Sequence, residues 1–191
     1  LTVDYYFKNP TFKSLLLPYL DGKISDKAFQ SVLKFRKPAF KKMHQWIYQN
    51  IKGIIASDLD YDIPMQGNPK YLGMIPNPIN LEKLPYIPLT IADRIVVFHG
   101  INTDNNYKKG NDYFEKALEI IAEKYGDKVE IITTRNIPYQ EYIEIYNRAH
   151  ILLDMVYSFD QGFHALEAMA KGKVVFTGAE TEFYDYYQLD E

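Results

Sequence analysis

The sequence predicts an α/β protein with a doubly wound, Rossmann-like parallel sheet, and three features of the chain after Ile91 lead to this prediction. Four short apolar runs follow one another, as expected of strands that are buried on both faces. Amphipathic helical patterns alternate with these runs. The connections between them are short, so we expect right-handed crossovers and a parallel sheet covered by helices on both faces.

The four predicted strands are rich in β-branched and other apolar residues. They cover residues 94–98, 129–133, 150–156 and 173–176. Ligands of such a sheet bind beyond the carboxyl ends of the strands, where loops meet the amino termini of helices. We therefore expect the functional residues in the loops at 99–111, 133–138, 157–163 and 177–182.

Three predicted helices separate these strands. The first runs from about Asp112 to Tyr125, and Gly126 stands where a left-handed residue often ends a helix. Its apolar residues recur at helical spacing. Pro138 begins the second helix, which has Tyr142, Ile143 and Tyr146 on one side. The third helix covers residues 163–171 between two glycines.

The segment before the sheet is punctuated by prolines and has a mostly helical pattern. Ser25 is the predicted N-cap of one helix, Pro38 begins a second, and residues 54–56 form a predicted strand. We predict a partial N-terminal domain and interdomain crossover over residues 1–80, and the sheet domain over residues 81–191. Because the chain begins at Leu1 and ends soon after the fourth strand, we expect a fragment, with the sheet domain truncated at its C-terminus.

Composition excludes several classes of function. The net charge of −3 among 191 residues does not favour nucleic acid as a partner. With no cysteine, the chain has no disulfide and no thiol nucleophile, which fits a cytoplasmic protein. Residues 34–42 are rich in lysine and arginine, and they form either a solvated helix face or a basic patch that contacts the inner face of an anionic membrane.

Two of the predicted loops carry groups that bind anions. Lys108 and Lys109 stand just before a helix, where an ammonium beside unpaired amide groups suits a diphosphate. Gly162 allows a ligand to approach the backbone, and the amides of Phe163 and His164 lie at the positive end of the next helix. Glu167 lies one turn further on and can accept hydrogen bonds from vicinal hydroxyls. On spacing alone, solvated lysines and an ordinary amphipathic helix remain alternatives.

These motifs resemble those of retaining GT-B glycosyltransferases of the family-4 type. Lys109-Gly110 is similar to the lysine-glycine pair that opens a helix after the first strand in that family. The stretch from Gly162 to Val175 resembles the family's signature of glycine, Leu-Glu-Ala-Met-Ala, glycine and valine. Upstream, Ile75-Pro76-Asn77-Pro78 is similar to its interdomain crossover. The resemblance covers about residues 50–180 and implies a C-terminal nucleotide-sugar-binding domain.

The resemblance also implies roles. Lys109 and Glu167 are the expected catalytic residues, with Lys109 on the diphosphate of the donor and Glu167 on its ribose. The other residues expected to bind the donor are Lys108, Gly110, Asn136, Ile137, Pro138, Asp160, Gly162, Phe163 and His164. Asn136, Ile137 and Pro138 are expected to line the base pocket through backbone groups. The expected donor is a nucleotide-diphosphate sugar, the acceptor is a glycan or a lipid-linked molecule, and no metal or other cofactor is expected.

Two positions depart from the family pattern. Phe159 stands eight residues before Glu167, where the family commonly has a carboxylate, and Asp160 is next to it. Ile101 replaces a common arginine after the first strand's glycine. The alternatives are a nucleotide-sugar epimerase of the same architecture, or a catalytically degenerate module that binds nucleotides or serves as a scaffold.

Other polar residues are expected to be structural. We interpret Asp58, Asp60 and Asp62 as solvated aspartates of a turn-rich segment, because they lie outside the ligand edge of the sheet. His99 either faces the ligand or is an ordinary packed or exposed histidine, and His150 is expected to be structural.

Overall fold

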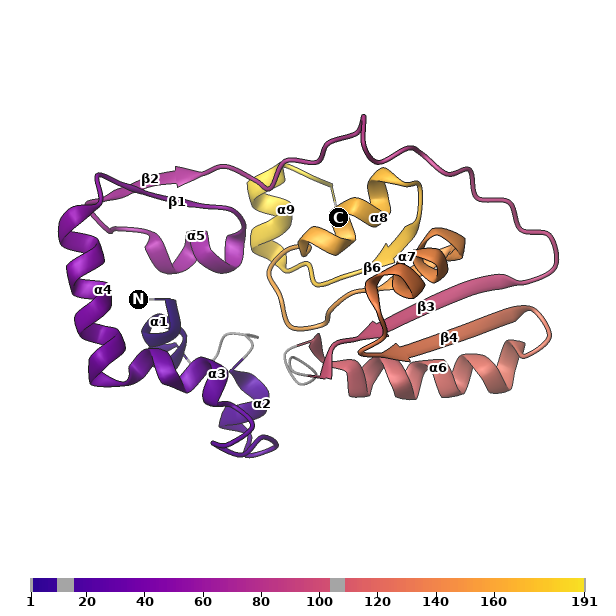
Figure 1. The fold of residues 1–191 in the computed structure, drawn as a ribbon, viewed down its shortest axis with the longest axis horizontal. Helices are drawn as coiled ribbons and strands as arrows, with labels where there is room; N and C mark the ends of the chain where they lie inside the picture. The colour runs from indigo at the N-terminus through magenta and orange to yellow at the C-terminus, as the bar shows by residue number, and fades with distance from the viewer. Residues whose placement is uncertain (1, 10–15, 104–108, 191) are drawn as a thin grey trace. The chain divides into compact units, whose positions relative to one another are not determined.

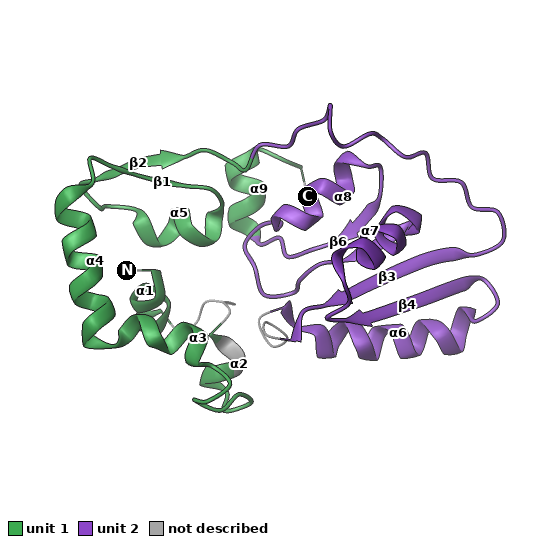
Figure 2. Ribbon diagram, viewed as in Figure 1, with its two compact units in different colours: residues 1–77, 181–191 green, residues 78–180 purple. Residues whose placement is uncertain are grey.

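The computed structural model describes residues 2–9, 16–103 and 109–190, which form two compact units. Unit 1 comprises Leu1–Asn77 and Thr181–Glu191, and unit 2 comprises Pro78–Glu180 (Figure 2). The predicted division lay between residues 80 and 81 and assigned the C-terminal residues to the sheet domain. In the structure, residues 181–191 group with unit 1 instead.

Unit 2 contains a four-stranded parallel sheet (Figure 1). The strands lie in the order β4-β3-β5-β6, so the chain crosses to the other side of β3 between β4 and β5. The prediction of an α/β protein with a parallel sheet is confirmed. The strands are β3 (Ile95–Ile101), β4 (Val129–Arg135), β5 (Ile151–Leu153) and β6 (Val174–Phe176).

Helices cover both faces of β3. The helices are α6 (Asn111–Tyr125), α7 (Tyr139–Arg148) and α8 (Phe163–Ala170). Neighbouring residues of a strand point to opposite faces of a sheet. Phe98 packs against Tyr142 and Tyr146 of α7, whereas His99 contacts Asn111 and Phe114 of α6. This double burial explains why β3 is continuously apolar up to Phe98.

The core of unit 2 lies on the α7 and α8 side of the sheet. Phe98, Tyr146, Ala149, Leu152 and Ala168 form a fully buried cluster there. Because these residues come from β3, α7, β5 and α8, the cluster joins the sheet to two of its helices.

Two details of unit 2 differ from the predictions. The third strand was predicted to extend to Val156, but β5 ends at Leu153. Beyond that point the amide of Val156 donates to the carbonyl of Lys109 at 2.9 Å, so the chain bonds to the loop after β3 instead of continuing a strand. Gly126 was predicted as a left-handed helix end, but its φ of −42° is right-handed.

Unit 1 consists of short helices and a two-stranded parallel sheet, β1-β2. The predicted helix at Pro38 is confirmed as α4. The one predicted from Ser25 is shorter than expected, because residues 26–29 form turns and α3 passes directly into a 3-10 turn. The elements are α1 (Thr2–Lys8), α2 (Leu17–Leu20), α3 (Gln30–Leu33), η1 (Lys34–Arg36), α4 (Pro38–Asn50), β1 (Ile54–Ala56), α5 (Leu59–Met65), β2 (Tyr71–Met74) and α9 (Thr181–Tyr187).

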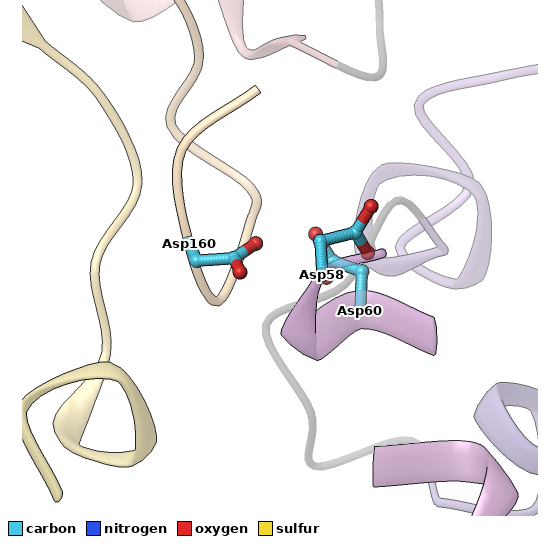
Figure 3. Close-up of side chains that lie close together, drawn as sticks. All are labelled: Asp58, Asp60 and Asp160. Carbon is cyan, nitrogen blue, oxygen red and sulfur yellow. The ribbon is translucent and has the colours of Figure 1, made fainter. Parts of the chain in front are cut away.

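The aspartates of residues 58–62 were wrongly interpreted as a solvated turn. They begin the helix α5, and Figure 3 shows Asp58 and Asp60 there. Asp58 is the N-cap, and its carboxylate accepts from the amide of Tyr61 at 3.2 Å. Asp62 is buried and accepts hydrogen bonds from Tyr71 Oη and Gln66 Nε2. Aspartate favours helix amino termini because its oxygens pair with amides that have no helical acceptor, so Asp58 stabilises the start of α5, and Asp62 links α5 to β2 through Tyr71.

No helix in the described ranges is long and apolar enough to cross a membrane.

Candidate functional site

A pocket of about 280 Å³ opens at the carboxyl ends of β3 and β4 in unit 2. Four residues predicted to bind a ligand line it: Lys109, Asn136, Ile137 and His164. Its other lining residues are Gly100, Ile101, Asn102, Thr134, Tyr139 and Tyr142. Its volume lies near the lower end of about 300–1,000 Å³ for small-molecule pockets, which suits one moiety of a ligand.

The position of this pocket follows from the strand order. After β3 the chain turns to one side, and after β4 it crosses to the other, so the loops after β3 and β5 diverge. Such a reversal leaves a crevice at the carboxyl edge of a parallel sheet. The end of β3, Lys109 and His164 of α8 all line the pocket.

Aromatic side chains form one wall. The ring of Tyr142 lies 5.2 Å from that of Phe98, 5.7 Å from that of Tyr146 and 6.1 Å from that of His164, centroid to centroid. Burial raises the pKa of Tyr142 to about 12, and the charges of Asp154 and Glu167 act in the same direction. The phenol is therefore neutral at physiological pH, and Tyr142 lines the pocket with an uncharged aromatic side chain.

Gly100 makes room for this wall. A Cβ atom at this position would lie 2.8 Å from Cε2 of Tyr142. A side chain here would therefore push Tyr142 away from the end of β3.

Asn136 holds two of the loops together. Its backbone is left-handed, with φ of +49°, and its amide donates to the carbonyl of Ile101 at 3.2 Å. Its side-chain Oδ1 accepts from the amide of Thr103 at 3.0 Å, and its Nδ2 donates to Thr103 Oγ1. The side chain is thus committed to the loop after β3, and it joins this loop to the one after β4.

Lys109 is paired with a buried carboxylate. Its Nζ lies 2.9 Å from Oδ1 of Asp154, whose side chain is only 2% exposed. The other oxygen, Oδ2, accepts from the amide of Gly162 at 3.3 Å and from Thr177 Oγ1 at 3.2 Å. Asp154 therefore joins the loops after β3, β5 and β6 to the residue that precedes α8.

Asp154 was missed by the sequence reasoning, which placed it inside the third strand. A signal for it exists, since it is the first charged residue after an apolar run and stands where a parallel strand reaches its ligand edge.

Two predicted glycines allow these loops to approach one another. Gly110 is left-handed, with φ of +67°, and a Cβ atom on it would lie 2.8 Å from Cβ of Val156. A Cβ atom on Gly162 would lie 2.8 Å from Cε of Met155 and 3.1 Å from Oδ2 of Asp154. Neither glycine lines the pocket, and each allows close packing of the loops beside it.

The first turn of α8 is fixed from the core. Tyr146 Oη donates to the carbonyl of His164 at 2.9 Å. The first four amides of a helix have no acceptor within it, so the amides of Phe163 and His164 lie at the positive end of α8. The side chain of Phe163 is exposed.

Glu167 lies on the same helix, one turn beyond the pocket. Its Oε2 is 3.7 Å from His164 Nδ1, and its side chain is 27% exposed. Glu167 does not line the pocket, but its neighbour His164 does.

Pro138 and Asp160, which were also predicted to bind the donor, are not among the residues that line the pocket. Pro138 is the N-cap of α7, and Asp160 is buried in the loop before α8 (Figure 3). Lys108 lies outside the described residues. Of the two departures from the family pattern, Phe159 is buried, while Ile101 is the last residue of β3 and lines the pocket.

His99 faces away from the pocket, toward α6. It is fully buried, and its Nε2 lies 3.0 Å from Oδ1 of Asn111. Since Oδ1 is an acceptor, Nε2 carries the proton, and Nδ1 has no partner among the described residues. Burial lowers the pKa of His99, so the ring is neutral. Of the two interpretations left open for this residue, packing describes it better.

Fold and site define a class: an α/β protein that presents a lysine, a helix amino terminus and an aromatic wall at the carboxyl edge of a parallel sheet. No protein-family profile matches the chain, and a search of curated proteins found no relative.

Proposed function

We propose that this chain carries the nucleotide-sugar-binding part of a glycosyltransferase with a GT-B architecture. It would transfer a sugar from a nucleotide-diphosphate donor to a glycan or lipid-linked acceptor. Retention of configuration and independence from metal are part of the proposal, and both rest on the resemblance of the Lys109-Gly110 and 162–175 motifs.

One observation carries the proposal: residues from motifs far apart in the sequence line one pocket. Lys109 comes from the first motif and His164 from the second, and Asn136 and Ile137 add the segment expected to hold the base. These motifs lie far apart along the chain, so they would not be expected to meet in one pocket by chance. A site with these parts has a cation, a helix amino terminus and aromatic side chains, which match a phosphate group and a base or sugar ring.

The proposed chemistry is electrostatic. When the bond between the sugar and the diphosphate breaks, negative charge grows on the leaving diphosphate. The Lys109 ammonium and the first amides of α8 stabilise this charge more strongly in the transition state than in the ground state. One such preorganised donor contributes about 3 kcal/mol to lowering the barrier. Glu167, beside His164, is proposed to accept hydrogen bonds from the ribose hydroxyls.

Calorimetric titration with UDP, GDP and ADP tests this proposal on the full chain. We expect one of the three to bind, and Lys109→Ala to weaken that binding about 10- to 100-fold, because a hydrogen bond to a charged group contributes about 1.5–3 kcal/mol. Glu167→Ala is expected to weaken it as well. Lys116→Ala and Glu119→Ala, both on the exposed side of α6, are the matched controls and are expected to leave binding unchanged.

Two results would contradict the proposal. If none of the three nucleotides binds, the degenerate module is the better interpretation. If the Lys109→Ala variant and its control bind the nucleotide equally well, Lys109 does not contribute to binding. Where binding is found, transfer or hydrolysis of the sugar donor separates a transferase from an epimerase.

A further inference from the structure

The carboxylate of Asp154 accepts hydrogen bonds from three groups that are also suited to binding a phosphate. An ammonium, a backbone amide and a hydroxyl surround it, at 2.9 Å for Lys109 Nζ, 3.3 Å for the Gly162 amide and 3.2 Å for Thr177 Oγ1. Each of these three is a donor of the kind that proteins use for phosphate oxygens.

This carboxylate cannot easily move aside. Its side chain is 2% exposed, and the backbone amide of Asp154 donates to the carbonyl of Phe176 at 2.9 Å, so the residue is anchored on both sides. Gly162 packs closely over it, since a Cβ atom there would lie 3.1 Å from Oδ2. The negative charge therefore stays beside Lys109 when a ligand arrives.

The consequence for binding follows from charge. Lys109 neutralises Asp154 at close range, so a second anion next to Lys109 meets a cation that is already paired, and it is also repelled by the carboxylate. An anion therefore gains less here than it would beside an unpaired lysine, and one without other contacts binds weakly. A ligand that also packs against Tyr142 and the 136–139 segment gains enough from these contacts to bind in spite of the carboxylate.

We propose that Asp154 is a specificity-determining residue, which weakens binding of simple phosphates at the Lys109 site and so restricts it to phosphates attached to a larger group. This inference rests on the proposed function, because it assigns the selectivity of the same pocket.

The test compares inorganic pyrophosphate with the nucleoside diphosphate that binds the unmodified chain, by calorimetry at constant ionic strength. Asp154→Asn keeps the size of the side chain and removes its charge. We expect this variant to bind pyrophosphate at least tenfold more tightly than the unmodified chain does. Because the same charge also repels the diphosphate of the nucleotide, we expect the affinity for the nucleotide to rise by a similar factor, while pyrophosphate binding becomes measurable without contacts to Tyr142.

Thr177→Val is a second variant that keeps the carboxylate and its ion pair and removes only one anchoring hydrogen bond. It leaves the buried charge paired and is therefore expected to fold even if Asp154→Asn does not. Without this hydrogen bond the carboxylate can turn further away from Lys109, so we expect a smaller gain in pyrophosphate affinity, about two- to threefold. Circular dichroism and thermal unfolding establish that each variant is folded.

The outcomes separate the two proposals. If the nucleotide binds the unmodified chain but neither variant gains pyrophosphate affinity, the role of Asp154 is overturned while the proposed function stands. Tighter nucleotide binding by Asp154→Asn with unchanged pyrophosphate binding would likewise overturn this role of Asp154. If neither nucleotide nor pyrophosphate binds any form, both proposals fail.

Discussion

At the scale of single residues, Tyr146 connects the core of unit 2 with the pocket. Its ring is buried in the cluster around Phe98, and its hydroxyl holds the carbonyl of His164 in the first turn of α8. The sequence pattern predicted an apolar helix face with Tyr146 on it, which is correct. The hydroxyl contact was not predictable, because it joins residues of two helices whose packing the spacing does not specify.

We predict that Tyr146→Phe lowers the free energy of unfolding by about 1 kcal/mol, since a buried hydrogen bond contributes roughly 0.5–1.5 kcal/mol. Urea denaturation measures this change. Tyr139→Phe is the matched control, because Tyr139 is 74% exposed, and we expect no measurable effect. Equal effects of the two substitutions would show that the His164 contact does not stabilise unit 2.

At the scale of elements, the loops after β3 and β5 can pack together only because their backbones approach closely at the carboxyl edge of the sheet. Gly110 begins α6 in a left-handed conformation and lies against Val156 of the loop after β5. The resemblance singled out this glycine for its place beside Lys109. The structure adds a steric reason for it, since only a residue without a side chain lets these two loops meet.

We predict that Gly110→Ala destabilises the protein by roughly 1–3 kcal/mol, through left-handed strain and displacement of Val156. The control is Gly67→Ala, at a glycine with φ of +77° and nothing within 4 Å of an added Cβ. It experiences the strain without the clash, so thermal unfolding should show a smaller loss. The steric explanation is wrong if Gly67→Ala costs as much.

At the scale of the whole molecule, a buried histidine links stability to pH. Burial lowers the pKa of His99 below its ordinary value of 6.5, so on acidification the unfolded chain takes up a proton before the folded one does. The stability that this neutral ring contributes is present above about pH 6.5. It is lost as pH falls from there toward the folded pKa.

We therefore predict that the free energy of unfolding decreases between pH 7 and pH 5, with a contribution from His99 of at most about 1.4 kcal/mol per pH unit. His99→Gln should reduce this slope, even though the substitution itself lowers stability. His164→Gln, at a histidine with an exposed side chain, is the control and should leave the slope unchanged. A slope that is the same in all three proteins would exclude His99 as its source.

The sequence by itself determined the order of strands and helices after Ile91 and the loops in which to look for a site. This was possible because burial on both faces leaves an unbroken apolar run in a strand such as 95–98, and a helix shows its own period. Local patterns failed at Asp58, Asp60 and Asp62, which belong to the start of the helix α5 and not to a solvated turn. They also failed at Asp154, which was assigned to a strand because an apolar run precedes it.

Only the tertiary structure decided which side chains share a pocket. Strand order determines that the loops after β3 and β4 and the start of α8 meet, and no local pattern in the sequence encodes strand order. The pairing of Lys109 with Asp154 joins residues 45 positions apart and depends on the register of β3 beside β5. Electrostatic interactions act through space, so the charge beside Lys109 could be known only from the folded chain.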